Sequence, residues 1–306
     1  GMMLYEYDDA ANRFNDTTVL NITLRNAFNL RNNSEVIWAN TQMISIPSSG
    51  GMIHASMPKL NPDYINSNDI CKWLGMPIKI AEMFYTENGV PLDEDVTRNI
   101  GDLYNLRVAQ AKDRLYIREG RMTIDMHFER EPRFYAWVGF DGGVWFGAGQ
   151  YNDKNASSLR YLGFKIGETD GTEGQGLWTG YIPKKFIPYE AQVNAINNIS
   201  SPSYAWPIIR LSDLYLLYAE AINEVEGPNG PNSAELFRYI DLVRARAGLK
   251  GVKESWNTYT NNPKYETKEG MRKIIQRERL IELAFEGHRF WDIRRWKTAP
   301  AEYHRP

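Results

Sequence analysis

Residues that carry metal and covalent chemistry are scarce in this sequence. Cys71 is the single cysteine among 306 residues, which excludes an intramolecular disulfide, a Cys-x-x-Cys redox pair and a cysteine-rich zinc site. The four histidines, His54, His127, His288 and His304, stand in unrelated contexts, and none belongs to an HExxH motif or accompanies a GxSxG serine. The sequence therefore supports neither zinc hydrolysis nor a serine triad, and it implies no metal and no cofactor.

Charge of one sign and long apolar runs are also missing. The 36 basic and 38 acidic side chains are mixed along the chain and give a net charge of −2, so no electrostatic footprint for nucleic acid or an anionic membrane surface exists. No apolar run approaches the roughly 20 residues that a membrane span needs. The first 14 residues lack the charged, apolar and cleavage regions of a signal peptide. Asp170 and Glu173 do not follow calcium-loop spacing.

A helix pattern and an unusual charge pattern coincide near the C-terminal end. One helical stripe consists of Met271, Ile274, Ile275, Ile281 and Phe285. Glu278 and Glu282 fall on the same stripe, and buried carboxylates are tolerated only beside cations. A solvated, highly charged helix is the alternative. Four large apolar residues between Phe290 and Trp296 weigh against it, because they need somewhere to be buried.

Two further helices precede this stretch. Ser212 is a candidate N-cap for an apolar stripe from Leu214 to Val225, a helix that we expect to be buried on most sides. Ser233 is a candidate cap for a helix that ends at Gly248, and Thr267 for the C-terminal helix. Helices joined by so short a turn form an antiparallel hairpin of about the length of a tetratricopeptide (TPR) unit.

These helices should supply arginines to the buried glutamates. Arg210, Arg244 and Arg246 are the helix-borne cations that we expect to reach them. The full expected network is Arg210, Glu220, Arg244, Arg246, Glu278, Arg279, Glu282, Glu286 and Arg289. Most of these carboxylates should then lie within salt-bridge distance of an arginine.

The first two thirds of the chain show little helical periodicity. Residues 2–70 favour loops with short helical or extended pieces, including a strand at 36–39, and a short helix is expected over 78–85. Asp141-Gly142-Gly143 suggests a hairpin turn between aromatic strands at 133–138 and 144–146. We therefore predict one mainly α domain over 1–306, with a loop-rich lobe at 2–206 and a helical scaffold at 207–296.

Several ordered motifs carry a family resemblance. The segment ERLIELAFEGHRFWDIRRW, residues 278–296, resembles the C-terminal signature of the SusD/RagB family, ERRxELAFEGxRFxDxRRW. SEVIWA (34–39), EPRFYAWV (131–138), YAWPIIRLSDLYLLYAEA (204–221) and LVRARAGL (242–249) agree with the family in order. Relative to the family pattern the chain starts late and stops early, so we interpret it as a fragment or truncated member.

The resemblance implies a fold and a role. It implies a SusD-like helical scaffold with TPR-like hairpins and a non-catalytic, lipid-anchored protein of the outer membrane's cell-surface face. Such a protein binds glycans or other nutrients for polysaccharide utilization and covers a SusC-like TonB-dependent transporter. This sequence shows no lipobox of its own, and the lipid anchor would lie outside it.

The resemblance also indicates where a ligand would bind. The loops between the PRFY and PIIRL motifs would contribute the contacts, and flat aromatic rings suit the C–H faces of sugars. Our candidates are Trp145, Tyr151, Tyr161 and Trp178, for each of which core packing is the alternative. Two other functions remain open: a protein-protein interaction scaffold without a ligand, and a glycoside hydrolase that uses paired carboxylates.

Overall fold

The computed structural model describes residues 14–31, 33–41, 51–60, 74–169, 179–193 and 199–303. The α-helices are α1 (Asp16–Asn29), α2 (Met52–Ser56), α3 (Ile78–Met83), α4 (Pro132–Trp137), α5 (Leu211–Val225), α6 (Ser233–Arg246), α7 (Val252–Tyr259), α8 (Lys268–Glu282), α9 (His288–Arg295) and α10 (Ala299–Tyr303). Of the residues that the structure describes, 44% are helical and 14% are in strands, which confirms the mainly α class.

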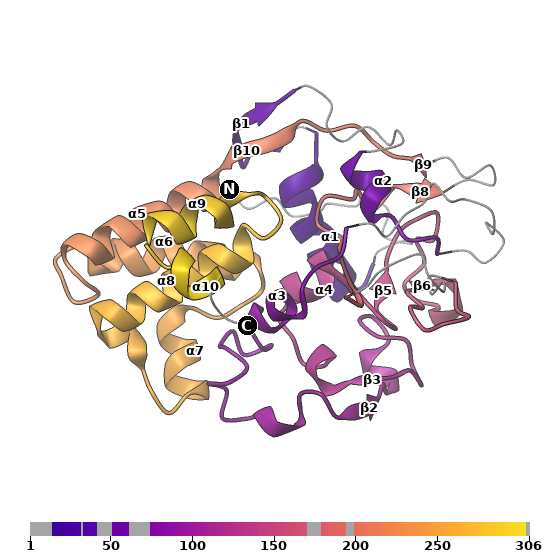
Figure 1. Cartoon of the computed structure of the whole chain (residues 1–306), viewed down its shortest axis with the longest axis horizontal. Helices are drawn as coiled ribbons and strands as arrows, with labels where there is room; N and C mark the ends of the chain where they lie inside the picture. The colour runs from indigo at the N-terminus through magenta and orange to yellow at the C-terminus, as the bar shows by residue number, and fades with distance from the viewer. Residues whose placement is uncertain are drawn as a thin grey trace.

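Short antiparallel strand pairs make up the β structure of the described residues. The pairs are β1 (Val36–Asn40) with β10 (Trp206–Arg210), β2 (Leu106–Val108) with β3 (Met122–Ile124), β4 (Val138–Phe140) with β7 (Tyr181–Pro183), β5 (Val144–Trp145) with β6 (Arg160–Tyr161), and β8 (Gln192–Val193) with β9 (Ile199–Ser200). Helices α5 to α10 gather on one side of the molecule, and most strands lie on the other (Figure 1).

The C-terminal helices form the expected scaffold. Helices α5 and α6 pack side by side as a hairpin, and α8 packs against α5 (Figure 1). Thr267 caps α8 as predicted, because its side chain accepts a hydrogen bond from the amide of Gly270 at 3.1 Å. The prediction that Ser212 caps α5 is wrong. The helix begins at Leu211, whose amide donates to the Glu35 carbonyl at 2.8 Å.

One face of α5 is exposed, contrary to our expectation. Leu214, Leu217, Tyr218 and Val225 follow a helical stripe and are 38% to 81% exposed. The opposite face, which includes Leu216, is buried against α6 and α8. The helix is thus apolar on two sides, but the described residues cover only one of them.

One hydrophobic core joins the two predicted lobes. Phe84 and Trp137 from the N-terminal part share a buried cluster with Leu216, Ile240 and Ile274 of the scaffold helices. The segment that contains Trp137 corrects a prediction. Residues 132–137 form α4 and not a strand, and β4 and β5 pair with β7 and β6 instead of with each other.

Helix α1 was not anticipated. Its sequence, DTTVLNITLRNAFN, is rich in β-branched residues and asparagine, which have modest helix propensity. Tertiary contacts offset this, because Arg25 donates to the carbonyls of Ile187 (2.7 Å) and Phe146 (3.0 Å) and Asn29 to that of Lys185. None of the helices in the described ranges is long and apolar enough to span a bilayer.

His127 should make the stability of the protein sensitive to acid. Its ring nitrogens lie 2.7 Å from Thr123 Oγ1 and 2.8 Å from the Tyr181 hydroxyl. Burial, together with the charge of Arg130, lowers the pKa of His127 to about 3. The unfolded chain, with a histidine pKa of about 6.5, therefore binds the proton more readily, and stability falls as the pH drops from about 6.5 towards 3.

The measurement is urea unfolding at pH 7, 6, 5 and 4, with His127→Gln for comparison. Glutamine does not titrate. The difference in free energy of unfolding between the unaltered protein and His127→Gln should therefore shrink below pH 6, by up to about 1.4 kcal/mol per pH unit. Parallel pH profiles for the two proteins would contradict the assignment.

Candidate functional site

The C-terminal signature places two carboxylates at the centre of the protein. Glu278 and Glu282 of α8 are both 0% exposed. Arg133 Nη1 of α4 donates to Glu278 at 2.6 Å and to Glu282 at 3.3 Å, and Arg244 of α6 reaches Glu278 at 3.2 Å. Residues almost 150 positions apart in the chain thus meet. Both buried glutamates are paired with arginines.

Glu282 has further partners. Arg210 is the last residue of β10 and not helix-borne as expected; its Nη2 lies 3.2 Å from the Glu282 carboxylate. Arg246 of α6 also pairs with Glu282. Burial alone would raise the pKa of Glu282, but the charges of Arg246, Arg210, Lys185 and Arg133 outweigh it and hold that pKa well below its usual value. Glu282 is therefore ionised.

Four residues of this ionic core were not assigned from the sequence. Glu131 pairs with Arg133 at 2.6 Å, and Glu35 pairs with both Arg246 and Arg210. Lys185 Nζ lies 2.5 Å from Glu286. Glu131 and Arg133 belong to the EPRFYAWV motif and Glu35 to SEVIWA, so the motifs marked their positions, but only the fold shows their partners.

The remaining charges of the signature form a second group. Arg279 contacts Asp213 at 2.8 Å and Asp292 at 3.1 Å, and Arg295 holds Glu220 at 2.6 Å. Two expectations therefore need correction. Glu220 pairs with α9 and not with the helix-borne arginines of the core. Arg289 lies 2.8 Å from Glu302 of α10, and this pair is partly exposed and separate from the buried network.

Glu286 follows the end of α8 and fixes the chain there. It accepts from Arg210 Nη2 at 2.6 Å in addition to Lys185, and these charges lower its pKa against the effect of burial. The preceding Phe285 has a φ of 68°, outside the helix that our stripe assigned to it. The buried ion pairs compensate this costly backbone conformation.

This arrangement is poorly suited to acid-base catalysis. A glycosidase needs an accessible acid of raised pKa and a second carboxylate across the substrate. Burial does raise the pKa of Glu131, but its side chain is 0% exposed and bonded to Arg133. Among the described residues, no three His, Cys, Asp or Glu side chains are grouped so as to hold a metal ion.

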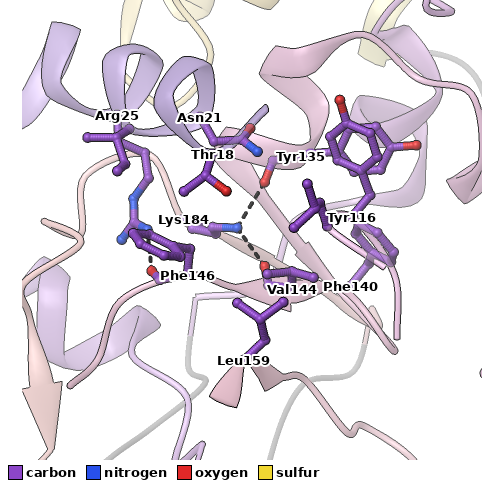
Figure 2. A pocket seen from close by; sticks show the side chains of 12 residues that line it. Thr18, Asn21, Arg25, Tyr116, Tyr135, Phe140, Val144, Phe146, Leu159 and Lys184 are labelled. Atoms are coloured by element: carbon purple, nitrogen blue, oxygen red, sulfur yellow. Dashed lines mark hydrogen bonds between the residues drawn. The ribbon is translucent and has the colours of Figure 1, made fainter. Parts of the chain in front are cut away.

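Trp145, one of the four ligand candidates, lies inside the protein. It is 0% exposed, and the side chains of Lys184 and Arg25 lie 5.5 and 5.8 Å from its ring centroids. Lys184 also donates to the carbonyls of Tyr135 and Val144, both at 2.9 Å (Figure 2). The adjoining cavity measures about 20 Å³, space for about one water. No sugar can reach this tryptophan.

Tyr151 presents a different case. Its ring is 40% exposed, and its inner side packs against Phe146 and Tyr189 with centroids 6.2 Å apart in each pair. Tyr161 on β6 is partly buried, and its hydroxyl is directed at the Arg114 carbonyl at 3.4 Å. Trp178 lies outside the described residues. Tyr151 is therefore the candidate with an accessible face and a fixed orientation.

The segment before Tyr151 is locked by backbone contacts. Gly147 has a φ of +101°, and a Cβ there would lie 1.9 Å from the Tyr189 carbonyl oxygen. The amide of Ala148 donates to the same oxygen at 3.1 Å, and Gly147 and Gln150 exchange two backbone bonds. Only glycine fits at 147, and the loop therefore holds Tyr151 at a set position.

Comparison with known proteins decides the family. A family model described as "SusD family" matches residues 34–306, which is most of the chain. The chain belongs to the SusD family. The matched region contains all of the buried ion pairs described above, and it starts at the SEVIWA motif.

Individual SusD-like relatives agree with this assignment. "SusD-like protein P25" of Formosa agariphila is 34% identical over 118 residues, covering 36% of this chain and 19% of the relative. The solved structure of "BT4246" superposes with a TM-score of 0.73 at 24% identity over 96% of this chain. A SusD-like protein from Bacteroides fragilis superposes over 92% with a TM-score of 0.62 at 22% identity.

The SusD relatives are considerably longer than this chain. The superposed parts span 45% of BT4246 and 47% of the Bacteroides fragilis protein. These similarities establish the fold of the chain.

Proposed function

We propose that this chain belongs to a non-catalytic glycan- or nutrient-binding protein of the bacterial cell surface. Membership of the SusD family over residues 34–306 is the observation that carries the proposal. The site chemistry supports it, since the central glutamates are buried and neutralised by arginines. Such carboxylates hold a frame and do not attack a substrate.

Tyr151 is the ligand contact that we propose from the structure. Its exposed ring offers a flat face to sugar C–H groups, and its inner contacts limit the entropy lost on binding. The exposed side chain of Asn152 follows Tyr151 in the chain, and the exposed Gln192 of β8 comes close to Gly149, where a Cβ would lie 3.1 Å from its Oε1; both can bond hydroxyls. Tyr161 and Trp178 stay candidates from the sequence, whereas Trp145 belongs to a buried hydrophobic cluster.

Affinity electrophoresis in gels that contain mixed plant or algal polysaccharides tests this function. The chain should be retarded, and Tyr151→Ala should weaken binding at least about tenfold, as expected for an aromatic contact at the centre of a site. Tyr218→Ala, which removes a similarly exposed ring from α5, is the matched control and should migrate like the unaltered chain. Equal retardation of both variants would exclude Tyr151.

The partner and location follow the same proposal. A SusD-type protein would be tethered to the outer membrane by a lipid and would cover a SusC-like TonB-dependent transporter. Copurification of the natural protein with such a transporter from outer membranes checks this. Recovery in the cytosolic fraction without a transporter would contradict it.

The exposed stripe of α5 favours a second candidate function. Leu214, Leu217 and Tyr218 offer an apolar helix face of the kind that binds another helix. In that case the chain is an interaction scaffold and its aromatic loops only pack. No retardation with any polysaccharide would favour this function, whereas reducing ends released over time would point to a hydrolase.

A further inference from the structure

A second cavity lies where the N-terminal end of α5 meets the C-terminal end of α6. It has a volume of about 190 Å³ and is lined by Glu35, Leu211, Ser212, Tyr215, Leu242, Val243 and Arg246. Leu242 is 38% exposed and Tyr215 is partly exposed, so the cavity opens to the surface. None of these residues belongs to the aromatic loop around Tyr151.

Two buried polar atoms at this cavity lack a partner. Ser212 and Arg246 are 3% and 5% exposed, and neither Ser212 Oγ nor Arg246 Nε has a hydrogen-bond partner within the described parts of the chain. The other two nitrogens of the Arg246 guanidinium are engaged by Glu35 and Glu282. Leaving such groups unpaired costs about 1–3 kcal/mol each, so a ligand that satisfies both is favoured.

The lining selects among ligand classes. An apolar ligand would leave both polar atoms unpaired. A simple anion would meet the carboxylate of Glu35, which lines the same space. A hydroxyl group can accept from Arg246 Nε or Ser212 and also donate to Glu35, and a ring bearing several hydroxyls satisfies all three.

Size and shape narrow the choice further. The volume of about 190 Å³ falls below the roughly 300–1,000 Å³ typical of pockets for drug-sized ligands, which indicates one small ring. Tyr215 and Leu242 provide apolar contacts beside the polar atoms, and the Tyr215 ring is held by Tyr239 with centroids 5.0 Å apart. An amphipathic wall of this kind suits a sugar ring.

We propose that this cavity binds a single sugar unit, with Ser212, Arg246 and Glu35 contacting its hydroxyls and Tyr215 and Leu242 its C–H face. The inference rests on the proposed glycan-binding function and gives it a second subsite, on the helical scaffold. The subsite would engage a chain end or a free monosaccharide, because its volume leaves room for one ring.

Titration of ¹⁵N-labelled protein with methyl α-D-glucoside, methyl β-D-galactoside and methyl α-D-mannoside tests the proposal by NMR. At least one glycoside should shift the Arg246 Nε–H resonance saturably. Ser212→Ala should weaken that binding about fivefold, the effect of one hydrogen bond. Leu242→Trp, which fills the cavity from its exposed rim, should abolish it. Ser233→Ala, in the first turn of α6, is the control for folding and should bind normally.

The outcomes separate this inference from the proposed function. If no glycoside shifts Arg246 while polysaccharides still retard the chain, the subsite is wrong and the glycan function stands. If a glycoside shifts it without any polysaccharide retardation, the subsite stands and the wider function fails. A shift that depends on protein concentration alone would show that a second copy fills the cavity, which overturns the proposal.

Discussion

Replacing Glu282 with glutamine should lower the free energy of unfolding by about 3–5 kcal/mol, the usual cost of breaking a buried ion pair. Glu282 is 0% exposed and is contacted by Arg246, Arg210 and Arg133. Glutamine has nearly the same shape, so packing is preserved and the loss reports charge. The three buried guanidinium groups that contact Glu282 would then lose a negatively charged partner. Against a typical total stability of about 5–15 kcal/mol, this is a severe loss.

Urea unfolding at pH 7 measures the effect as a lower midpoint at an unchanged slope. Glu235→Gln is the matched control, because Glu235 pairs with Arg238 on the exposed face of α6 and such pairs contribute little.

The lowered pKa of Glu282 adds a pH dependence to this effect. Its stabilising contribution is complete above the unfolded pKa of about 4.3 and is lost as the pH falls towards the lower folded value. The difference between the proteins should therefore shrink in acid. A loss at pH 7 no larger than that of Glu235→Gln would show that the network does not stabilise the fold.

The sequence contained enough to predict this network in outline. The positions of Glu278 and Glu282 on the apolar stripe of α8 indicate buried acids, and burial requires cations. Arg210, Arg244 and Arg246 do supply them. The partner Arg133 could not be found this way, because it lies 145 positions from Glu278. Helical spacing carries information about neighbours on one helix, but none about which distant segment packs there.

The failures have a common physical cause. The polar composition of residues 2–70 favoured loops and hid α1, yet the polar side chains of Arg25 and Asn29 in that helix are satisfied by the carbonyls of Phe146 and Lys185. The aromatic run at 132–137 fits a strand or a buried helix equally well by pattern, and Pro132 at the first turn of α4 is the feature that favours the helix. For Trp145 the sequence left ligand contact and core packing open, and the choice depends on Arg25 and Lys184, which approach the ring from distant segments.

Gly147→Ala should be the most damaging substitution for ligand binding outside the contact residues. The added Cβ would lie 1.9 Å from the Tyr189 carbonyl oxygen, far inside contact distance, and it would sit at a φ of +101°. The backbone conformation alone costs a non-glycine residue about 1–3 kcal/mol. The overlap cannot be relieved by rotating a side chain, since the atom that it meets belongs to the backbone. Either the loop at 147–151 or the segment at 189 must move.

Movement of either segment separates Tyr151 from Tyr189, whose rings now pack edge to face at 6.2 Å. We therefore expect Gly147→Ala to weaken polysaccharide retardation in the gel at least as much as Tyr151→Ala does, and also to lower the stability of the protein in urea. Gly167→Ala is the matched control, since Gly167 has a φ of +86° and a Cβ there meets no atom within 4 Å. It carries the backbone cost without the collision and leaves Tyr151 in place, so its retardation should be normal. If the two variants lose equal stability and both still bind, the loop does not position the ligand contact, and the binding face must be sought elsewhere on the protein. If Gly147→Ala alone stops binding, the backbone contact between residues 147–148 and the Tyr189 carbonyl is required to hold Tyr151 in its binding position.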